Sequence, residues 1–177
     1  MARFSIGRTS AAFALAALAL SGCVNNQLPP CPPVRIDNTT ARLIQFKEGA
    51  GRDISDVEYQ ADMVAYEGSC TFSEKGVEVQ MDLDFTLASG AAVKKGTPPI
   101  YYFVAVPQLF PDTVGKRVFQ LKHDVPSSPG VKEKVRESDI RVFIPLKKDE
   151  PAAAYDVYVG LQLTKEQLDY NRTQRQK

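Results

Sequence analysis

Few side chains in this chain of 177 residues combine the types and spacing that catalysis requires. The single histidine, His123, has no nucleophile motif near it, and acid–base or nucleophilic chemistry needs a second, matched group. The sequence also lacks the signatures of serine hydrolases, zinc proteases and nucleotide-binding loops. We therefore predict that His123 is a surface imidazole, that the protein is not an enzyme, and that it uses no cofactor.

Three acidic residues form the best candidate metal site in the sequence. Glu78, Asp82 and Asp84 alternate with apolar residues, so they share one face of a predicted strand. Clustered carboxylate oxygens suit Ca²⁺, which makes these residues candidates for a weak calcium site. The polar face of a half-exposed strand explains the same pattern, and we prefer that interpretation. The sequence therefore predicts no metal centre.

The first 22 residues have the pattern of an export signal. Arg3 and Arg8 precede ten apolar residues, Ala11 to Leu20. Because a bilayer span needs about 20 apolar residues, this run predicts a cleaved signal peptide rather than a membrane helix. The residues from Leu20 to Cys23 (LSGC) resemble the lipobox of bacterial lipoproteins, the substrates of signal peptidase II. This resemblance implies cleavage before Cys23 and a lipid on its thiol.

The same resemblance implies a location and a first partner. Two or three acyl chains, palmitate among them, would hold Cys23 stably in a membrane, whereas one chain is marginal. Lipoproteins with aspartate after the lipidated cysteine tend to stay in the inner membrane, but Val24 and Asn25 follow here. We therefore expect a bacterial envelope protein that is lipid-anchored in the outer membrane and faces the periplasm.

The other two cysteines, Cys31 and Cys70, are expected to form a disulfide. An exported protein matures in an oxidising compartment, where two free cysteines usually pair. A redox or metal pair is the alternative, although the chain has no CxxC motif. Residues 24–33 are rich in proline, which predicts a semi-rigid tether. A disulfide at Cys31 would leave residues 24–30 free, and these would extend about 22 Å at ~3.1 Å per residue.

The charge of the chain argues against nucleic acid as a partner. The net charge is +1, and removal of residues 1–22 takes away two arginines and no acid, which leaves 1 − 2 = −1. A near-neutral domain lacks the positive field that binding to a phosphate backbone requires.

The remaining sequence has the hydrophobic pattern of a β-sandwich. Apolar and polar residues alternate over the twelve positions Val77 to Ala88, which predicts a strand with one buried face. A turn at Ser73 to Gly76 joins it to a hairpin partner at residues 57–72. Further strands are predicted at Arg42–Phe46, Ile100–Val106, Lys116–Lys122, Ile140–Leu146 and Tyr155–Leu163. About seven strands predict an all-β, immunoglobulin-like or transthyretin-like sandwich.

The pattern changes near the C-terminus. Thr164 and Gln167 form a predicted capping box that starts a short helix ending at about Arg172. The expected organisation is a signal peptide at 1–22, the lipidated cysteine and tether at 23–33, the sandwich at 34–172, and a basic tail at 173–177.

Three functions are compatible with these features. The first is a membrane-anchored lipoprotein without enzymatic activity that scaffolds or assists another envelope protein. The second is a lipoprotein that binds a small ligand, a glycan or Ca²⁺. The third is a hydrolase that uses two convergent carboxylates, as glycosidases do. The short tether and the lack of catalytic motifs favour the first function.

Overall fold

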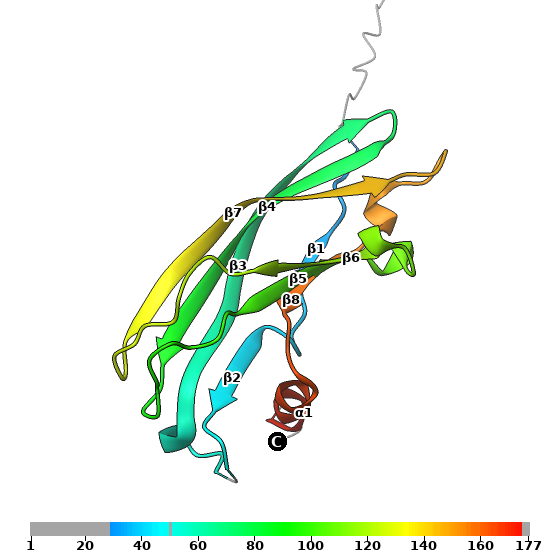
Figure 1. The fold of residues 1–177 in the computed structure, drawn as a ribbon. Coiled ribbons are helices and arrows are strands. Elements are labelled where there is room, and N and C mark those ends of the chain that lie inside the picture. The colour runs from blue at the N-terminus through cyan, green and yellow to red at the C-terminus, as the bar shows by residue number, and fades with distance from the viewer. Residues whose placement is uncertain (1–28, 50, 175–177) are drawn as a thin grey trace, which may run out of the picture.

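A computed structural model describes residues 29–49 and 51–174 of the chain. The predicted signal peptide, Cys23, residues 24–28 and the last three residues of the basic tail lie outside this part. Within it, the chain forms eight strands in two four-stranded sheets that pack face to face, with a C-terminal helix beside them (Figure 1). The predicted all-β sandwich is therefore confirmed, whereas immunoglobulin-like or transthyretin-like connectivity stays a prediction.

The smaller sheet contains three-residue and five-residue strands. Its order is β1-β8-β5-β6, in which β1 runs parallel to β8 and the other pairs are antiparallel. The strand bounds are Val34–Ile36 for β1, Tyr101–Ala105 for β5, Lys116–Gln120 for β6 and Val157–Leu161 for β8. The central position of β5 agrees with its sequence, which is apolar on both faces.

The larger sheet has the order β2-β3-β4-β7, and all of its strands are antiparallel. The bounds are Arg42–Phe46 for β2, Val57–Ser73 for β3, Gly76–Ser89 for β4 and Lys132–Pro145 for β7. The predicted hairpin is confirmed, because Ser73 pairs with Gly76 across the turn. Gly76 has φ +151°, a conformation that side chains with a Cβ rarely adopt.

The core lies between the sheets and is built by the alternation that the sequence shows. The inward residues of β4, from Val77 to Leu87, are all buried, and they face β5 and β8 of the other sheet. The ring of Tyr102 lies 5.4 Å from the ring of Phe85 and 5.3 Å from that of Phe119, so aromatic contacts join the two layers.

Two strands differ from the prediction. β7 begins at Lys132, eight residues before the expected Ile140, and β1 was not expected at all. β7 is an edge strand, and its first half carries many charged residues. The alternation of apolar and polar residues that reveals β4 is therefore missing from this half of β7. A bulge at Asp139, which has φ 61°, then shifts the inward positions by one residue. β1 has only three residues, too few for a periodic signal.

The chain enters the sandwich at a fixed point. Cys31 and Cys70 form a disulfide with an S–S distance of 1.98 Å and Cα atoms 5.8 Å apart, which confirms the predicted pairing. The Tyr66 hydroxyl donates to the carbonyl oxygen of Val34 at 2.7 Å, and β1 then joins β8. These bonds place the entry beside the β3–β4 turn. We call this end of the sandwich, with residues 29–33 and 73–76, the entry end.

The opposite end carries the helix. The helix α1 (Lys165–Gln174) starts with the predicted capping box: Thr164 N–H donates to the Gln167 side chain at 2.9 Å, and Gln167 N–H donates to Thr164 Oγ1 at 3.2 Å. It extends two residues beyond the predicted Arg172. No helix in the described part is long and apolar enough to cross a membrane. We call this end, with α1, residues 47–49 and 51–56 and residues 88–99, the helix end (Figure 1).

Candidate binding surfaces at the helix end

The three acidic residues of the candidate calcium site all have partners within the chain, and for two of them the partner is an arginine. The Asp84 carboxylate accepts two hydrogen bonds from Arg136, at 2.6 and 2.9 Å, and this guanidinium lowers the pKa of Asp84. Asp82 accepts the backbone N–H of Asp139 at 3.0 Å, and Glu78 lies 3.6 Å from Arg141. Among the described residues, no group of three potential ligands is placed to hold a metal ion.

His123 lies beside a buried acid that the sequence did not single out. Glu137 is 3% exposed and points inward from β7. Its Oε1 accepts the backbone N–H of Lys122 at 2.8 Å and lies 3.9 Å from His123 Nε2, which is longer than a hydrogen bond. Burial raises the pKa of the Tyr102 hydroxyl, and the Glu137 charge adds to this effect. Glu137 thus ties the segment after β6 to the edge strand.

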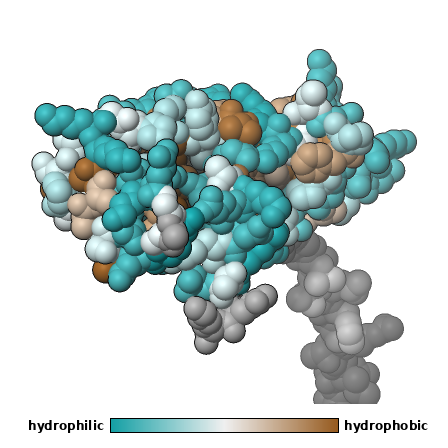
Figure 2. Space-filling view, turned by 60° about the horizontal axis from the view of Figure 1, so that its bottom comes forward, coloured by the Kyte–Doolittle hydropathy of each residue, from teal (hydrophilic) through white to brown (hydrophobic). Residues whose placement is uncertain are grey.

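The helix end presents an apolar side chain to solvent. Ile54 is 83% exposed, the highest value among the exposed large hydrophobic residues of the described chain. It lies on the short 3-10 turn η1 (Ile54–Asp56), between β2 and β3. In Figure 2, which turns the bottom of Figure 1 toward the viewer, the surface is mostly hydrophilic and hydrophobic residues appear as separate patches.

The turn that carries Ile54 is held rigidly. Asp53 accepts the N–H of Ile54 at 2.5 Å, and Asp56 accepts the N–H of Asp53 at 3.1 Å, which completes a capping box. The Lys47 ammonium lies 2.6 Å from the Asp56 carboxylate and lowers its pKa, with the Asp53 N–H adding to this. Since the backbone of η1 is fixed from both sides, Ile54 cannot easily fold back onto the domain.

An apolar hollow lies next to Ile54. It has a volume of about 620 Å³ and is formed where β3 begins, β4 ends and the chain leads into β7. Most of its lining residues are small or apolar: Ile54, Ser55, Val57, Gln60, Ala88, Ser89, Gly90, Ala91, Pro129 and Gly130. Gly90 is required here, because a Cβ at this position would lie 2.0 Å from the Val57 carbonyl oxygen. The hollow is within the size range of small-ligand sites and is open at the surface.

A second, more polar groove runs between α1 and the outer face of the larger sheet. Its volume is about 630 Å³. The Arg42–Asp62 ion pair, at 2.5 Å, and Lys132 line it together with the ring of Tyr170. Charged and amide side chains around an aromatic ring can bind a polar ligand by hydrogen bonds and ring stacking.

The helix that walls this groove is docked by specific contacts. Asn171 is buried and donates to the carbonyl oxygens of Thr39 and Arg42, at 3.0 and 2.7 Å. At the start of α1, Gln167 donates to the Gln45 side chain at 3.1 Å. The helix has little apolar surface of its own, so these side-chain contacts hold it in place. Two further contacts, of Glu166 and Tyr170, are described next.

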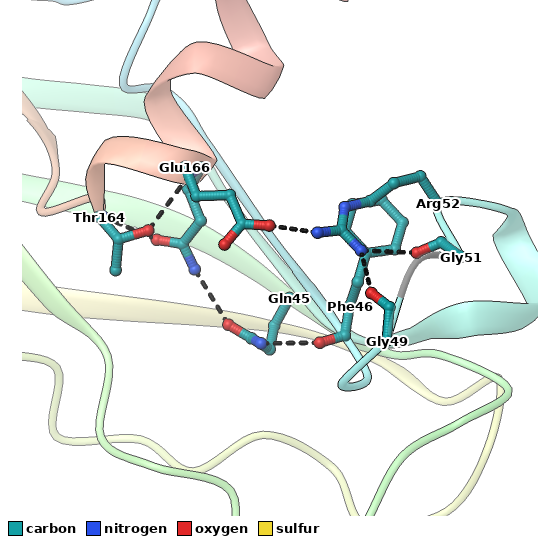
Figure 3. Close-up of polar contacts among 8 residues, drawn as sticks. Gln45, Phe46, Gly49, Gly51, Arg52, Thr164 and Glu166 are labelled. Atoms are coloured by element: carbon teal, nitrogen blue, oxygen red, sulfur yellow. Dashed lines mark hydrogen bonds and ion pairs between the residues drawn. The ribbon is translucent and has the colours of Figure 1, made fainter.

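Arg52 completes the docking from the loop after β2 (Figure 3). Its guanidinium pairs with Glu166 of α1, donates to the carbonyl oxygen of Gly51 at 2.7 Å, and lies 5.3 Å from the centre of the Phe46 ring. The Phe46 ring in turn makes an edge contact with Tyr170 at 5.1 Å. Arg52 therefore joins the 47–53 loop, strand β2 and the helix into one surface.

The two surfaces combine residues from distant parts of the chain. Sequence reasoning missed both of them, because neither forms a local motif. Comparisons with known proteins add no assignment: no protein-family description, curated protein or solved structure matches the chain.

Proposed function

We propose that this protein is a lipid-anchored envelope lipoprotein without enzymatic activity, and that its helix end binds another envelope protein. The observation that carries the proposal is the position of the Cys31–Cys70 disulfide. It places the start of the domain at the entry end, so a lipid on Cys23 would hold that end near the bilayer. The rigid Ile54 turn and the apolar hollow would then point away from the membrane, toward the periplasm.

The chemistry of the hollow favours a protein partner. Contact residues that dominate binding energy are commonly apolar side chains that enter pockets, surrounded by polar contacts that exclude water. Here Ile54 can enter a partner, and the adjacent hollow can accept an apolar side chain in return. Charged residues Lys47, Arg52 and Lys94 lie nearby, each paired within this chain. They suit the polar rim of such a contact.

Photo-cross-linking in intact cells tests this proposal. We expect a photoreactive residue at Ile54 to yield one reproducible protein adduct, and the same residue at Val118 to yield none. Val118 is the matched control because it is also exposed and belongs to the smaller sheet, on its edge strand β6. Filling the hollow with Ala88→Arg should remove the adduct. Equal cross-linking from both positions, or none from Ile54, would contradict the proposal.

Anchoring is tested in the same cells. The Cys23→Ala variant should be released from membranes or remain unprocessed, and its adduct at position 54 should weaken because the domain is no longer concentrated at the bilayer. If the variant is processed and fractionates with membranes like the unaltered chain, the lipid anchor is wrong.

The groove beside α1 supports a second candidate function. Arg42, Asp62, Lys132 and Tyr170 would suit a small polar ligand such as a glycan. A glycan should then bind the purified protein and lose affinity in the Tyr170→Ala variant, while Ile54→Ala binds normally. A result in which no glycan of an envelope-derived panel binds would remove this candidate.

A further inference from the structure

The connection between β5 and β6 exposes two apolar side chains. It contains the 3-10 turns η2 (Pro107–Leu109) and η3 (Thr113–Gly115). Phe110 is 53% exposed and Val114 is 46% exposed. The preceding residue, Leu109, is partly buried and packs against the core. We call residues 107–115 the Phe110 turn. Two apolar side chains exposed on one short turn form a local apolar surface, and such surfaces can mark sites of protein or membrane contact.

The Phe110 turn is too well bonded for this exposure to result from a loose backbone. Its two ends are joined by a hydrogen bond from Val106 N–H to the Gly115 carbonyl oxygen, at 2.8 Å. Inside the turn, Phe110 N–H donates to Pro107 and Asp112 N–H donates to Leu109, at 3.1 and 2.9 Å. The backbone therefore holds Phe110 and Val114 outward.

The Phe110 turn lies toward the entry end (Figure 1). Pro145, at the end of β7, pairs with Gly76 of the β3–β4 turn, and the chain then leads through residues 146–151 to the 3-10 turn η4 (Ala152–Ala154). The Gln108 side chain donates to the Ala154 carbonyl oxygen at 3.0 Å, which joins the Phe110 turn to η4. Since Val157, three residues after Ala154, donates its N–H to the Pro33 carbonyl oxygen at 2.9 Å, the Phe110 turn lies on the side of the sandwich where the described chain begins.

We propose that Phe110 and Val114 insert into the boundary between headgroups and acyl chains of the bilayer to which Cys23 is tied. This inference rests on the proposed lipid anchor. By its sequence, the segment of seven residues from Val24 to Pro30 would span about 22 Å as polyproline, which would keep the entry end near the bilayer surface. The anchor supplies a high local concentration, and two apolar side chains are then enough to orient the domain without binding membranes by themselves.

The charges near the Phe110 turn distinguish electrostatic binding to anionic lipid from insertion of apolar side chains. Asp112, Lys116 and the segment 147–150 (KKDE) together carry three lysines and three acids, so their net charge is 3 − 3 = 0. Binding of anionic lipid by a basic cluster is therefore not favoured, and the contact should depend on apolar insertion. It should persist on vesicles of phosphatidylcholine and at high salt.

The absence of tryptophan from the chain makes a direct test possible. Phe110→Trp introduces a single tryptophan, and Ile54→Trp is the matched control at the helix end. The chain from Cys23 onward is coupled through the Cys23 thiol to phosphatidylcholine vesicles that contain a maleimide lipid, while the disulfide occupies the other two cysteines. We expect the emission of Phe110→Trp to shift to shorter wavelength on coupling and to be quenched several-fold by lipids brominated in the upper acyl chain.

The emission of Ile54→Trp should not change on coupling, and Val114→Asp should reduce the quenching of Phe110→Trp. Unchanged emission of Phe110→Trp, or equal quenching of both tryptophans, would overturn the inference. A shift that grows with protein concentration without vesicles would also overturn it, because a second copy would then cover the turn. Since coupling here is chemical, failure of natural lipidation would appear only in the Cys23→Ala fractionation and not in this experiment.

Discussion

At the scale of single residues, the charged groups on the outer face of the larger sheet neutralise one another. Arg136 bonds Asp84 through both carboxylate oxygens and also contacts Glu67 at 3.2 Å. The sequence shows the acids at alternating positions, but their partners come from another strand. These bonds join β4 to β7, so the acidic row supports the pairing of the two strands.

The Asp84–Arg136 pair predicts how stability depends on pH. The pKa of Asp84 is lowered in the folded state, so its contribution is fully present above the unfolded value of 3.8 and is lost as pH falls through the lowered value. We expect Asp84→Asn to be slightly less stable than the unaltered chain at pH 7, since exposed ion pairs contribute little, and the difference to shrink below pH 3.8. Urea unfolding at several pH values measures this. Glu74→Gln, in the exposed β3–β4 turn, is the control and should show no such trend.

At the scale of elements, β7 is a long edge strand that carries several obstacles to further pairing. Its outer edge has free backbone groups that another strand could bind. The inward acid Glu137, the bulge at Asp139 and Pro145 at the strand's end interrupt that edge. The Arg117 guanidinium also covers the carbonyl oxygen of Arg141, at 3.0 Å. Such features are how natural sheets avoid edge-to-edge association.

We predict that Glu137→Val promotes self-association through β7. The substitution removes the inward charge and makes the strand more apolar, while it leaves the Lys122 N–H without its acceptor, at a cost of about 1–3 kcal/mol. Analytical ultracentrifugation should show a mass that rises with concentration. Lys134→Val adds the same side chain on the outward face and is the control. If the mass of the Glu137→Val variant does not rise above that of the unaltered chain, or both variants associate equally, the inward charge has no protective role.

At the scale of the whole molecule, the disulfide decides how the domain is joined to what precedes it. Cys31 precedes β1 of the smaller sheet, whereas Cys70 lies on β3 of the larger sheet, so the bond closes the sandwich at the entry end. The helix end is closed instead by α1, which contacts β2 and the 47–53 loop. The two ends therefore present different surfaces in opposite directions, which is the basis of the proposed function.

Loss of the disulfide should destabilise the fold without abolishing it. The bond joins two cysteines that are 39 positions apart and contributes about 4 kcal/mol by the loop-entropy relation. We expect the Cys31→Ala, Cys70→Ala double variant to lose about this much unfolding free energy in urea, and amide exchange to speed up in β1. The unaltered chain under reducing conditions should match the variant. If the double variant and the oxidised chain had the same midpoint of urea unfolding, the bond would not stabilise the domain.

The sequence alone determined the elements whose signal is local. Alternation in Val77–Ala88 predicted β4 and its buried face, because a half-buried strand repeats every two residues. Thr164 and Gln167 predicted the start of α1, because a capping box needs only neighbouring residues. The disulfide was predicted by elimination, because Cys31 and Cys70 are the two cysteines left once Cys23 is assigned to the expected lipid anchor.

Only the tertiary structure decided which surfaces the protein can offer. The hollow beside Ile54 is built from three separated segments, and the groove is walled by a helix whose anchor, Asn171, bonds carbonyl groups about 130 residues earlier in the chain. Exposure of Ile54 and Phe110 cannot be read from sequence, because it depends on how each turn packs against the two sheets. Residues that are distant in sequence become a site only when the packing of two sheets places them together.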